Sequence, residues 1–123
     1  MTPVRLDETL GGDSGIYFEG TLVEALQTEY QLIEVFDTAA LGKLMRIDGA
    51  NMTSERDEFF YHENLVHPAA ISHGDPRNVL IIGGGDGGSS EEILKHPSVK
   101  RVVLVELDEA VIAFANADFT QCE

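Results

Sequence analysis

The sequence predicts an α/β protein, in which a small N-terminal antiparallel β-sheet domain precedes the start of a Rossmann-like domain. Two observations predict this class. Residues 16–53 contain short runs of β-branched and aromatic residues between turn residues. Residues 78–108 read as strand, glycine-rich turn, helix and strand. We place the sheet domain at 1–53, a connecting helix at 54–73 and the first βαβ part of the Rossmann-like domain at 74–123. Such a domain needs more strands than two, so we expect it to be truncated here.

The N-terminal domain begins with a stretch poor in apolar residues, and the glycine-rich residues 11–15 predict a loop. Four short strands are predicted, at residues 16–22, 30–37, 43–48 and 51–53. Residues 38–42 and the Asp48-Gly49 pair are short enough to close hairpins. Because a small sheet is marginally stable alone, we expect one of its faces to be covered.

Residues 54–73 predict a helix. Ser54 followed by Asp57 matches the spacing of a capping box. A mostly apolar helical face is formed by Phe59, Phe60, Leu65, Val66 and Ala69. Pro68 is expected to kink or end the helix, because proline lacks a backbone N–H group. The Gly-Asp-Pro run that follows predicts a domain boundary near residue 74.

The glycine-rich turn after the first apolar run of the second domain predicts a nucleoside site. Gly83, Gly85 and Gly88 satisfy a GxGxxG pattern, in which glycines let the backbone approach a ligand. Glu106 ends the next strand, where a carboxylate can accept hydrogen bonds from ribose hydroxyls. Asp86 would repel a pyrophosphate, so an adenosyl sulfonium or an amine fits better. A ligand-free turn, with Asp86 as an exposed helix cap, is the competing interpretation.

The charge balance narrows the choice of partners. The chain has 8 Lys plus Arg against 22 Asp plus Glu, a net charge of −14, which disfavours nucleic acid and anionic membranes and favours cations. The single cysteine, Cys122, fits a reducing compartment. We see no leader peptide and no apolar run near about 18 residues, so we expect a cytoplasmic protein without a membrane span. The histidines form no tight group with cysteine, and no metal site is predicted.

Three motifs carry a family resemblance: DEFFYHE at 57–63, VLIIGGGDGG at 79–88 and VELD at 105–108. With their spacing they resemble the polyamine aminopropyltransferases, and among these the spermidine synthases, over roughly residues 16–112. The resemblance implies transfer of an aminopropyl group from decarboxylated S-adenosylmethionine to putrescine, giving spermidine and methylthioadenosine. It also implies a co-substrate without a permanently bound cofactor, and a homodimer or homotetramer.

The resemblance also implies residues that bind the donor. Gln31 resembles the family glutamine that contacts the adenosyl donor, and Glu106 resembles the ribose-binding glutamate. Gly83 and Gly85 belong to the turn that surrounds the donor. Glu91 departs from the family, because many relatives have arginine at this place after the glycine turn.

On the amine side, His62 with Tyr61 beside it resembles the pair that lines the polyamine pocket, and Asp86 resembles the aspartate that holds the amines of donor and acceptor. An aliphatic amine is almost wholly protonated at neutral pH, so a carboxylate must take its proton. In the family this base is an aspartate in a later segment. We expect it beyond Glu123 and assign no catalytic residue within this chain.

Two other functions remain open. A methyltransferase that uses S-adenosylmethionine shares the glycine turn and the ribose acid, although Asp86 and the YHE motif speak against it. Alternatively, the 123-residue chain is a non-catalytic part that folds, binds a nucleoside or self-associates. The acceptor amine is not predicted, because the residues that measure its length are expected outside this chain.

Overall fold

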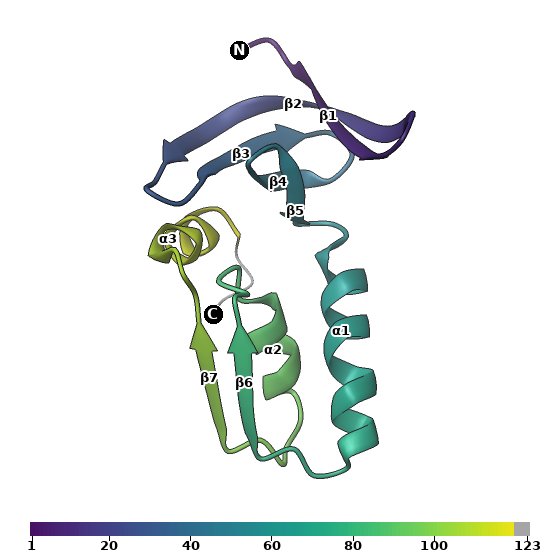
Figure 1. Ribbon diagram of the computed structural model, residues 1–123, viewed down its shortest axis with the longest axis vertical. Coiled ribbons are helices and arrows are strands. Elements are labelled where there is room, and N and C mark those ends of the chain that lie inside the picture. The colour runs from purple at the N-terminus through teal and green to yellow at the C-terminus, as the bar shows by residue number, and fades with distance from the viewer. Residues whose placement is uncertain (120–123) are drawn as a thin grey trace. The chain divides into compact units, whose positions relative to one another are not determined.

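The computed structural model describes residues 1–119. Cys122, from which a reducing compartment was predicted, lies outside them. The chain divides into two compact units, Met1–Asp57 and Glu58–Glu123. The first unit is an antiparallel sheet and the second holds a parallel strand pair with helices (Figure 1). The predicted class, an N-terminal antiparallel sheet followed by the start of a Rossmann-like domain, is confirmed.

The first unit is a five-stranded sheet in which sequence neighbours pair antiparallel. Its strands are β1 (Val4–Gly11), β2 (Ser14–Gln27), β3 (Leu32–Thr38), β4 (Gly42–Ile47) and β5 (Ala50–Ser54). The last three match predicted strands closely. Strand β1 was missed and β2 is longer than predicted at both ends, because both expose most of their side chains and are held by ladder hydrogen bonds more than by burial.

One buried apolar cluster of this sheet consists of Leu6, Phe36 and Leu44, with Phe18 and Leu41 packed against it. These side chains meet because of strand register. Leu6 lies opposite Phe18, and Phe36 lies opposite Leu44. Cross-strand pairs of this kind are the main source of sheet stability, so the register of β1 is fixed by one buried leucine in an otherwise exposed strand.

The second unit is a βαβ arrangement preceded by a helix. Its elements are α1 (Glu58–His73), β6 (Asn78–Ile82), α2 (Gly88–Leu94), β7 (Arg101–Val105) and α3 (Glu109–Asp118). Strands β6 and β7 pair in parallel, α2 connects them, and α1 packs on α2 (Figure 1). Among residues 1–119, no helix has both the length and the apolar character that a membrane crossing requires.

Helix α1 begins four residues after the predicted start and runs through Pro68 to His73. Pro68 therefore does not end the helix. The lost backbone hydrogen bond is offset by packing on α2, since tertiary contacts supply most helical stability. Residues 55–57 form a turn instead, in which the Ser54 hydroxyl donates to the Asp57 carboxylate. Helix α1 belongs to the second unit, while the division at residues 53 and 74 stays a prediction.

Candidate functional site

The turn between β6 and α2 has backbone conformations that favour glycine. The φ angles of Gly83, Gly84 and Gly87 are +78°, +72° and +86°, in the left-handed region. The Gly83 N–H group donates to the carbonyl of Val105 at 2.8 Å, which holds the turn beside the end of β7. The glycine pattern noted in the sequence therefore brings backbone to the carboxyl ends of both parallel strands, where α/β sheets bind their ligands.

Glu106 follows β7 and contacts this turn directly. Its carboxylate accepts hydrogen bonds from the Gly85 N–H group at 2.9 Å and from the Asp108 N–H group at 3.2 Å. A Cβ atom on Gly85 would lie 2.8 Å from the same carboxylate, so only glycine permits this approach. The structure thus brings together two predicted donor-binding residues, Gly85 and Glu106. Asp108 caps α3 by accepting from the Ala110 N–H group at 3.1 Å.

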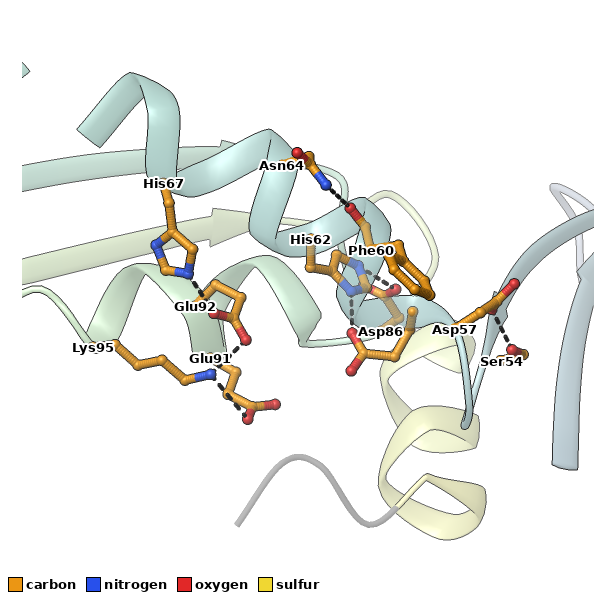
Figure 2. A network of polar contacts seen from close by, with 11 residues as sticks. Ser54, Asp57, Phe60, His62, Asn64, His67, Asp86, Glu91, Glu92 and Lys95 are labelled. Carbon is orange, nitrogen blue, oxygen red and sulfur yellow. Dashed lines mark hydrogen bonds and ion pairs between the residues drawn. The ribbon is translucent and has the colours of Figure 1, made fainter. Parts of the chain in front are cut away.

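His62 lies between two carboxylates (Figure 2). Its Nδ1 atom bonds to the carboxylate of Glu58, one turn earlier on α1, and its Nε2 atom is 3.1 Å from Oδ2 of Asp86 in the glycine turn. The imidazole is 4% exposed, whereas the side chains of Glu58 and Asp86 are 10% and 20% exposed. Two predicted amine-site residues, His62 and Asp86, are therefore in contact.

The first residue of α2 fixes the position of the His62 ring. A Cβ atom on Gly88 would lie 2.1 Å from Cε1 and 2.2 Å from Nδ1 of His62, so the imidazole occupies the space that any larger residue would need. Gly88 was noted in the sequence as the third glycine of GxGxxG. In this chain its absent side chain makes room for a histidine from α1.

His62 carries a positive charge at neutral pH. A neutral imidazole donates from only one nitrogen, while here each nitrogen faces a carboxylate, and two donors require the imidazolium. Burial lowers the pKa of His62, but the hydrogen bonds and charges of Asp86 and Glu58 outweigh it and raise the pKa to about 9. Sequence reasoning did not single out Glu58, although its spacing of four residues from His62 on a predicted helix was a usable signal.

Tyr61 and Gln31 are two further predicted ligand residues, and they belong to different units. The Tyr61 side chain is 65% exposed, and its ring meets the His62 ring edge-on at 5.3 Å between centroids. Gln31 belongs to the first unit, where its N–H group donates to the Thr28 hydroxyl at 3.1 Å in the turn before β3. The ligand-binding roles of Tyr61 and Gln31 stay predictions.

A second polar network joins α1 to α2 (Figure 2). The buried Glu92 pairs with His67 Nε2 at 2.7 Å and with Lys95 Nζ at 2.5 Å, and His67 Nδ1 is 2.9 Å from His96 Nε2. Burial raises the pKa of Glu92, but the Lys95 and His67 hydrogen bonds outweigh it and lower that pKa overall. The network holds α1 against α2 and so keeps His62 over Gly88.

One hollow of the second unit is lined by other residues. A cavity of about 700 Å³ between α1 and β6 is lined mainly by apolar side chains, among them Leu65, Val79, Ile81 and Ile93. None of the predicted site residues lines it, and its apolar walls do not suit a charged amine. Within residues 1–119, no group of three or more histidine, cysteine or acidic side chains could hold a metal ion.

Comparison with known proteins gives the family. The model of the spermine/spermidine synthase domain matches residues 58–122. The chain belongs to the spermine/spermidine synthase family. The polyamine aminopropyltransferase of Nitrosomonas europaea is 51% identical over 110 residues, which cover 89% of this chain and 34% of the relative. That of Leptospira biflexa strain Patoc is 46% identical over 100 residues, which cover 81% of this chain and 36% of the relative.

Solved structures of this family have the same fold. Spermidine synthase from Thermotoga maritima matches with a TM-score of 0.90 and 39% identity, over 97% of this chain and 42% of that chain. A spermidine synthase in complex with the transition state analogue AdoDATO matches with a TM-score of 0.91 and 39% identity, over 97% of this chain and 41% of that chain. The chain spans about a third of the length of these curated family members, as the coverage of 34% and 36% shows.

Proposed function

We propose that the whole protein is a spermidine synthase, which transfers an aminopropyl group from decarboxylated S-adenosylmethionine to putrescine and gives spermidine and methylthioadenosine. Family membership and the named relatives support this activity. The observation that carries the proposal is the position of Asp86. The Asp86 carboxylate belongs to the glycine turn, and the Gly85 N–H group of the same turn donates to Glu106.

The proposed reaction is a displacement. An amine nitrogen of putrescine forms a bond to the propyl carbon next to the sulfonium, the carbon–sulfur bond breaks, and methylthioadenosine leaves as a neutral molecule. The attacking nitrogen loses a proton to a base, which the family resemblance leads us to expect beyond Glu123. The leaving group is good, so the protein must mainly hold two cationic molecules in line and deprotonate one amine.

Each site residue has a proposed task in this reaction. Glu106, already bound to the Gly85 N–H group, accepts hydrogen bonds from the ribose hydroxyls of the donor. Asp86 binds the ammonium groups, since a carboxylate can accept several hydrogen bonds and is not saturated by one donor. Gln31 contacts the adenosyl group and Tyr61 lines the polyamine pocket. A cytoplasmic location and a homodimer or homotetramer are part of the same proposal.

The charge of the turn favours this reaction over methyl transfer. An aminopropyltransferase and a methyltransferase both bind a nucleoside that carries a sulfonium, and Glu106 could bind the ribose of either donor. Only the aminopropyl donor lacks the carboxylate of the methionine group, and an aspartate near that position would repel the carboxylate of S-adenosylmethionine. Asp86 is thus the residue on which the two proposals differ.

Substitution of Asp86 by Asn tests the proposal. Release of methylthioadenosine from decarboxylated S-adenosylmethionine and putrescine should fall about 10- to 100-fold, because a hydrogen bond to a charged group contributes about 1.5–3 kcal/mol. Asp75→Asn is the matched control, because Asp75 is 58% exposed and pairs with Arg77 at the surface. An unchanged rate in Asp86→Asn, or no methylthioadenosine release by the unmodified protein, would contradict the proposed function.

A further inference from the structure

We propose that Thr28 and Asp48 are positioning residues, which hold the backbone of Gln31 so that its side chain is presented to the adenosyl donor in one direction. This inference rests on the proposed function, which gives Gln31 its contact with the adenosyl group. Thr28 and Asp48 belong to neither the glycine turn nor helix α1. All three residues lie in the first unit, so their contacts are a property of that unit alone.

Thr28 binds both backbone polar groups of Gln31. Its hydroxyl accepts hydrogen bonds from the Gln31 N–H group at 3.1 Å and from the Tyr30 N–H group at 3.1 Å. The Gln31 carbonyl accepts from the Thr28 N–H group at 2.9 Å and from the Thr28 hydroxyl at 3.2 Å. Threonine hydroxyls commonly make such local bonds in turns, and here they close residues 28–31 into a loop between β2 and β3.

Asp48 binds the backbone of the next residue, Leu32. The Leu32 N–H group donates to Oδ1 of Asp48 at 2.8 Å, and the Leu32 carbonyl accepts from the Asp48 N–H group at 2.9 Å. The planar peptide group before the Gln31 Cα atom is therefore held by Thr28, and the peptide group after it is held by Thr28 and Asp48 together. With both peptide planes held, the direction of the Gln31 Cα–Cβ bond is fixed as well.

The hairpin turn in which Asp48 lies does not by itself require a carboxylate. Asp48 is exposed and forms the turn between β4 and β5 with Gly49, at φ angles of +50° and +82°. Glycine, asparagine and aspartate all suit the first position of such a turn. What the aspartate side chain adds is the bond to Leu32. Because water competes for the groups of an exposed hydrogen bond, this bond adds little to global stability and acts mainly on the order of the loop.

An ordered loop favours ligand binding, because glutamine is long and flexible. Binding a ligand through such a side chain costs conformational entropy of both the backbone and the side chain. Where the backbone is already held, the backbone part of that cost is absent when the ligand binds. Loosening the loop should therefore weaken binding of the nucleoside and leave the chemical step unchanged.

Substitutions of Asp48 and Thr28 test the proposal. Asp48→Gly removes the carboxylate but keeps a residue that adopts positive φ freely, so the hairpin should still form. Asp48→Asn keeps an oxygen that can accept the Leu32 N–H bond, and is measured in fresh protein because Asn-Gly pairs deamidate. Thr28→Val removes the hydroxyl and Thr28→Ser keeps it. Asp13→Gly is the matched control, because Asp13 is an exposed aspartate in the turn between β1 and β2.

Amide hydrogen exchange of the whole protein, followed by NMR, reports on the loop without any ligand. The Leu32 amide in Asp48→Gly and the Gln31 amide in Thr28→Val should each exchange about tenfold faster than in the unmodified protein, because each loses its acceptor. Asp48→Asn, Thr28→Ser and Asp13→Gly should exchange at the unmodified rates. Equal rates in all six proteins would overturn the proposal, because the loop would then not be held by these side chains.

Calorimetry with methylthioadenosine tests whether the loop matters for the ligand. Asp48→Gly and Thr28→Val should each raise the Kd about three- to tenfold, which is the range of one hydrogen bond, while Asp48→Asn, Thr28→Ser and Asp13→Gly should change it less than about twofold. In steady-state kinetics, KM for decarboxylated S-adenosylmethionine should rise by a similar factor, and kcat and KM for putrescine should stay unchanged.

A double variant separates positioning from a general structural role. If Asp48 acts through Gln31, then Asp48→Gly should change the Kd of methylthioadenosine less than about twofold in a Gln31→Ala background. A full effect in that background would overturn the proposal, and so would an unchanged Kd in Asp48→Gly or a failure of Asp48→Asn to restore it. If the unmodified protein shows neither binding nor turnover, the proposed function is contradicted and this inference with it.

Discussion

Gly88→Ala is the substitution with the sharpest expected effect on stability. Gly88 is the first residue of α2 and is not among the glycines with positive φ, so its backbone accepts alanine. The added methyl group would lie 2.1 Å from Cε1, 2.2 Å from Nδ1 and 2.6 Å from Cγ of His62. Carbon atoms in contact are about 3.5–4.0 Å apart, so the ring must move by roughly 1.5 Å.

Two terms of opposite sign decide the result. Alanine in place of glycine stabilises a helix by about 0.5–1 kcal/mol. Displacing the ring weakens its bonds to Glu58 and Asp86, and each charge-assisted hydrogen bond contributes about 1.5–3 kcal/mol. We therefore expect Gly88→Ala to lower the free energy of unfolding by about 2 to 4 kcal/mol. The loss should disappear when His62 is absent.

Urea denaturation of the unmodified protein, Gly88→Ala, His62→Ala and the double variant measures both terms. Gly88→Ala is compared with the unmodified protein, and the same change is then made in a His62→Ala background, where it should be neutral or stabilising by up to about 1 kcal/mol. Ser90→Ala, two residues further along α2, is the control for a change within the helix. If Gly88→Ala is as stable as Ser90→Ala with His62 present, the imidazole does not occupy this space and the site geometry is wrong.

Two other predictions concern charge. The folded-state pKa of His62 is raised from 6.5 to about 9, so its contribution to stability is complete below pH 6.5 and is lost as the pH rises through 9. A pKa change of one unit corresponds to about 1.4 kcal/mol, so the loss of stability is roughly 3 kcal/mol at most. Urea midpoints measured at several pH values should show this loss in the unmodified protein but not in His62→Gln. Glu106→Ala should weaken methylthioadenosine binding about 10- to 100-fold by calorimetry, while the exposed Glu109→Ala should not; equal dissociation constants for Glu106→Ala and the unmodified protein would contradict its ribose-binding role.

The parts of the fold that the sequence predicted are those with an apolar pattern. Most side chains of strands β3 and β4 are buried. Strands β6 and β7 are short apolar runs, which the glycine turn and α2 connect. Strand β1 has one buried side chain, Leu6, and nearly all of β2 is exposed. Their pairing depends on backbone hydrogen bonds between distant residues, which leave little trace in local composition.

The site was predictable to a similar degree. The glycine pattern and the acid at the end of the next strand predicted the proximity of Gly85 and Glu106, because both belong to one βαβ unit. The contact of His62 with Asp86 depends on how α1 packs on α2, which no spacing within either helix determines. The family resemblance named both residues without indicating that they touch.

Net charge and local charge act at different ranges around this site. The net charge of −14 attracts cations from a distance, but salt screens that attraction beyond about 8–10 Å, and it gives no preference for one position on the protein. At the glycine turn the imidazolium of His62 cancels one of two nearby carboxylates. An ammonium that arrives there therefore meets one fixed negative charge whose orientation is set by a hydrogen bond. Under the proposed function, selectivity for an amine would depend on the geometry of Asp86 more than on the number of acids in the chain. Substitutions of exposed acids should then slow ligand association without changing which ligand is bound.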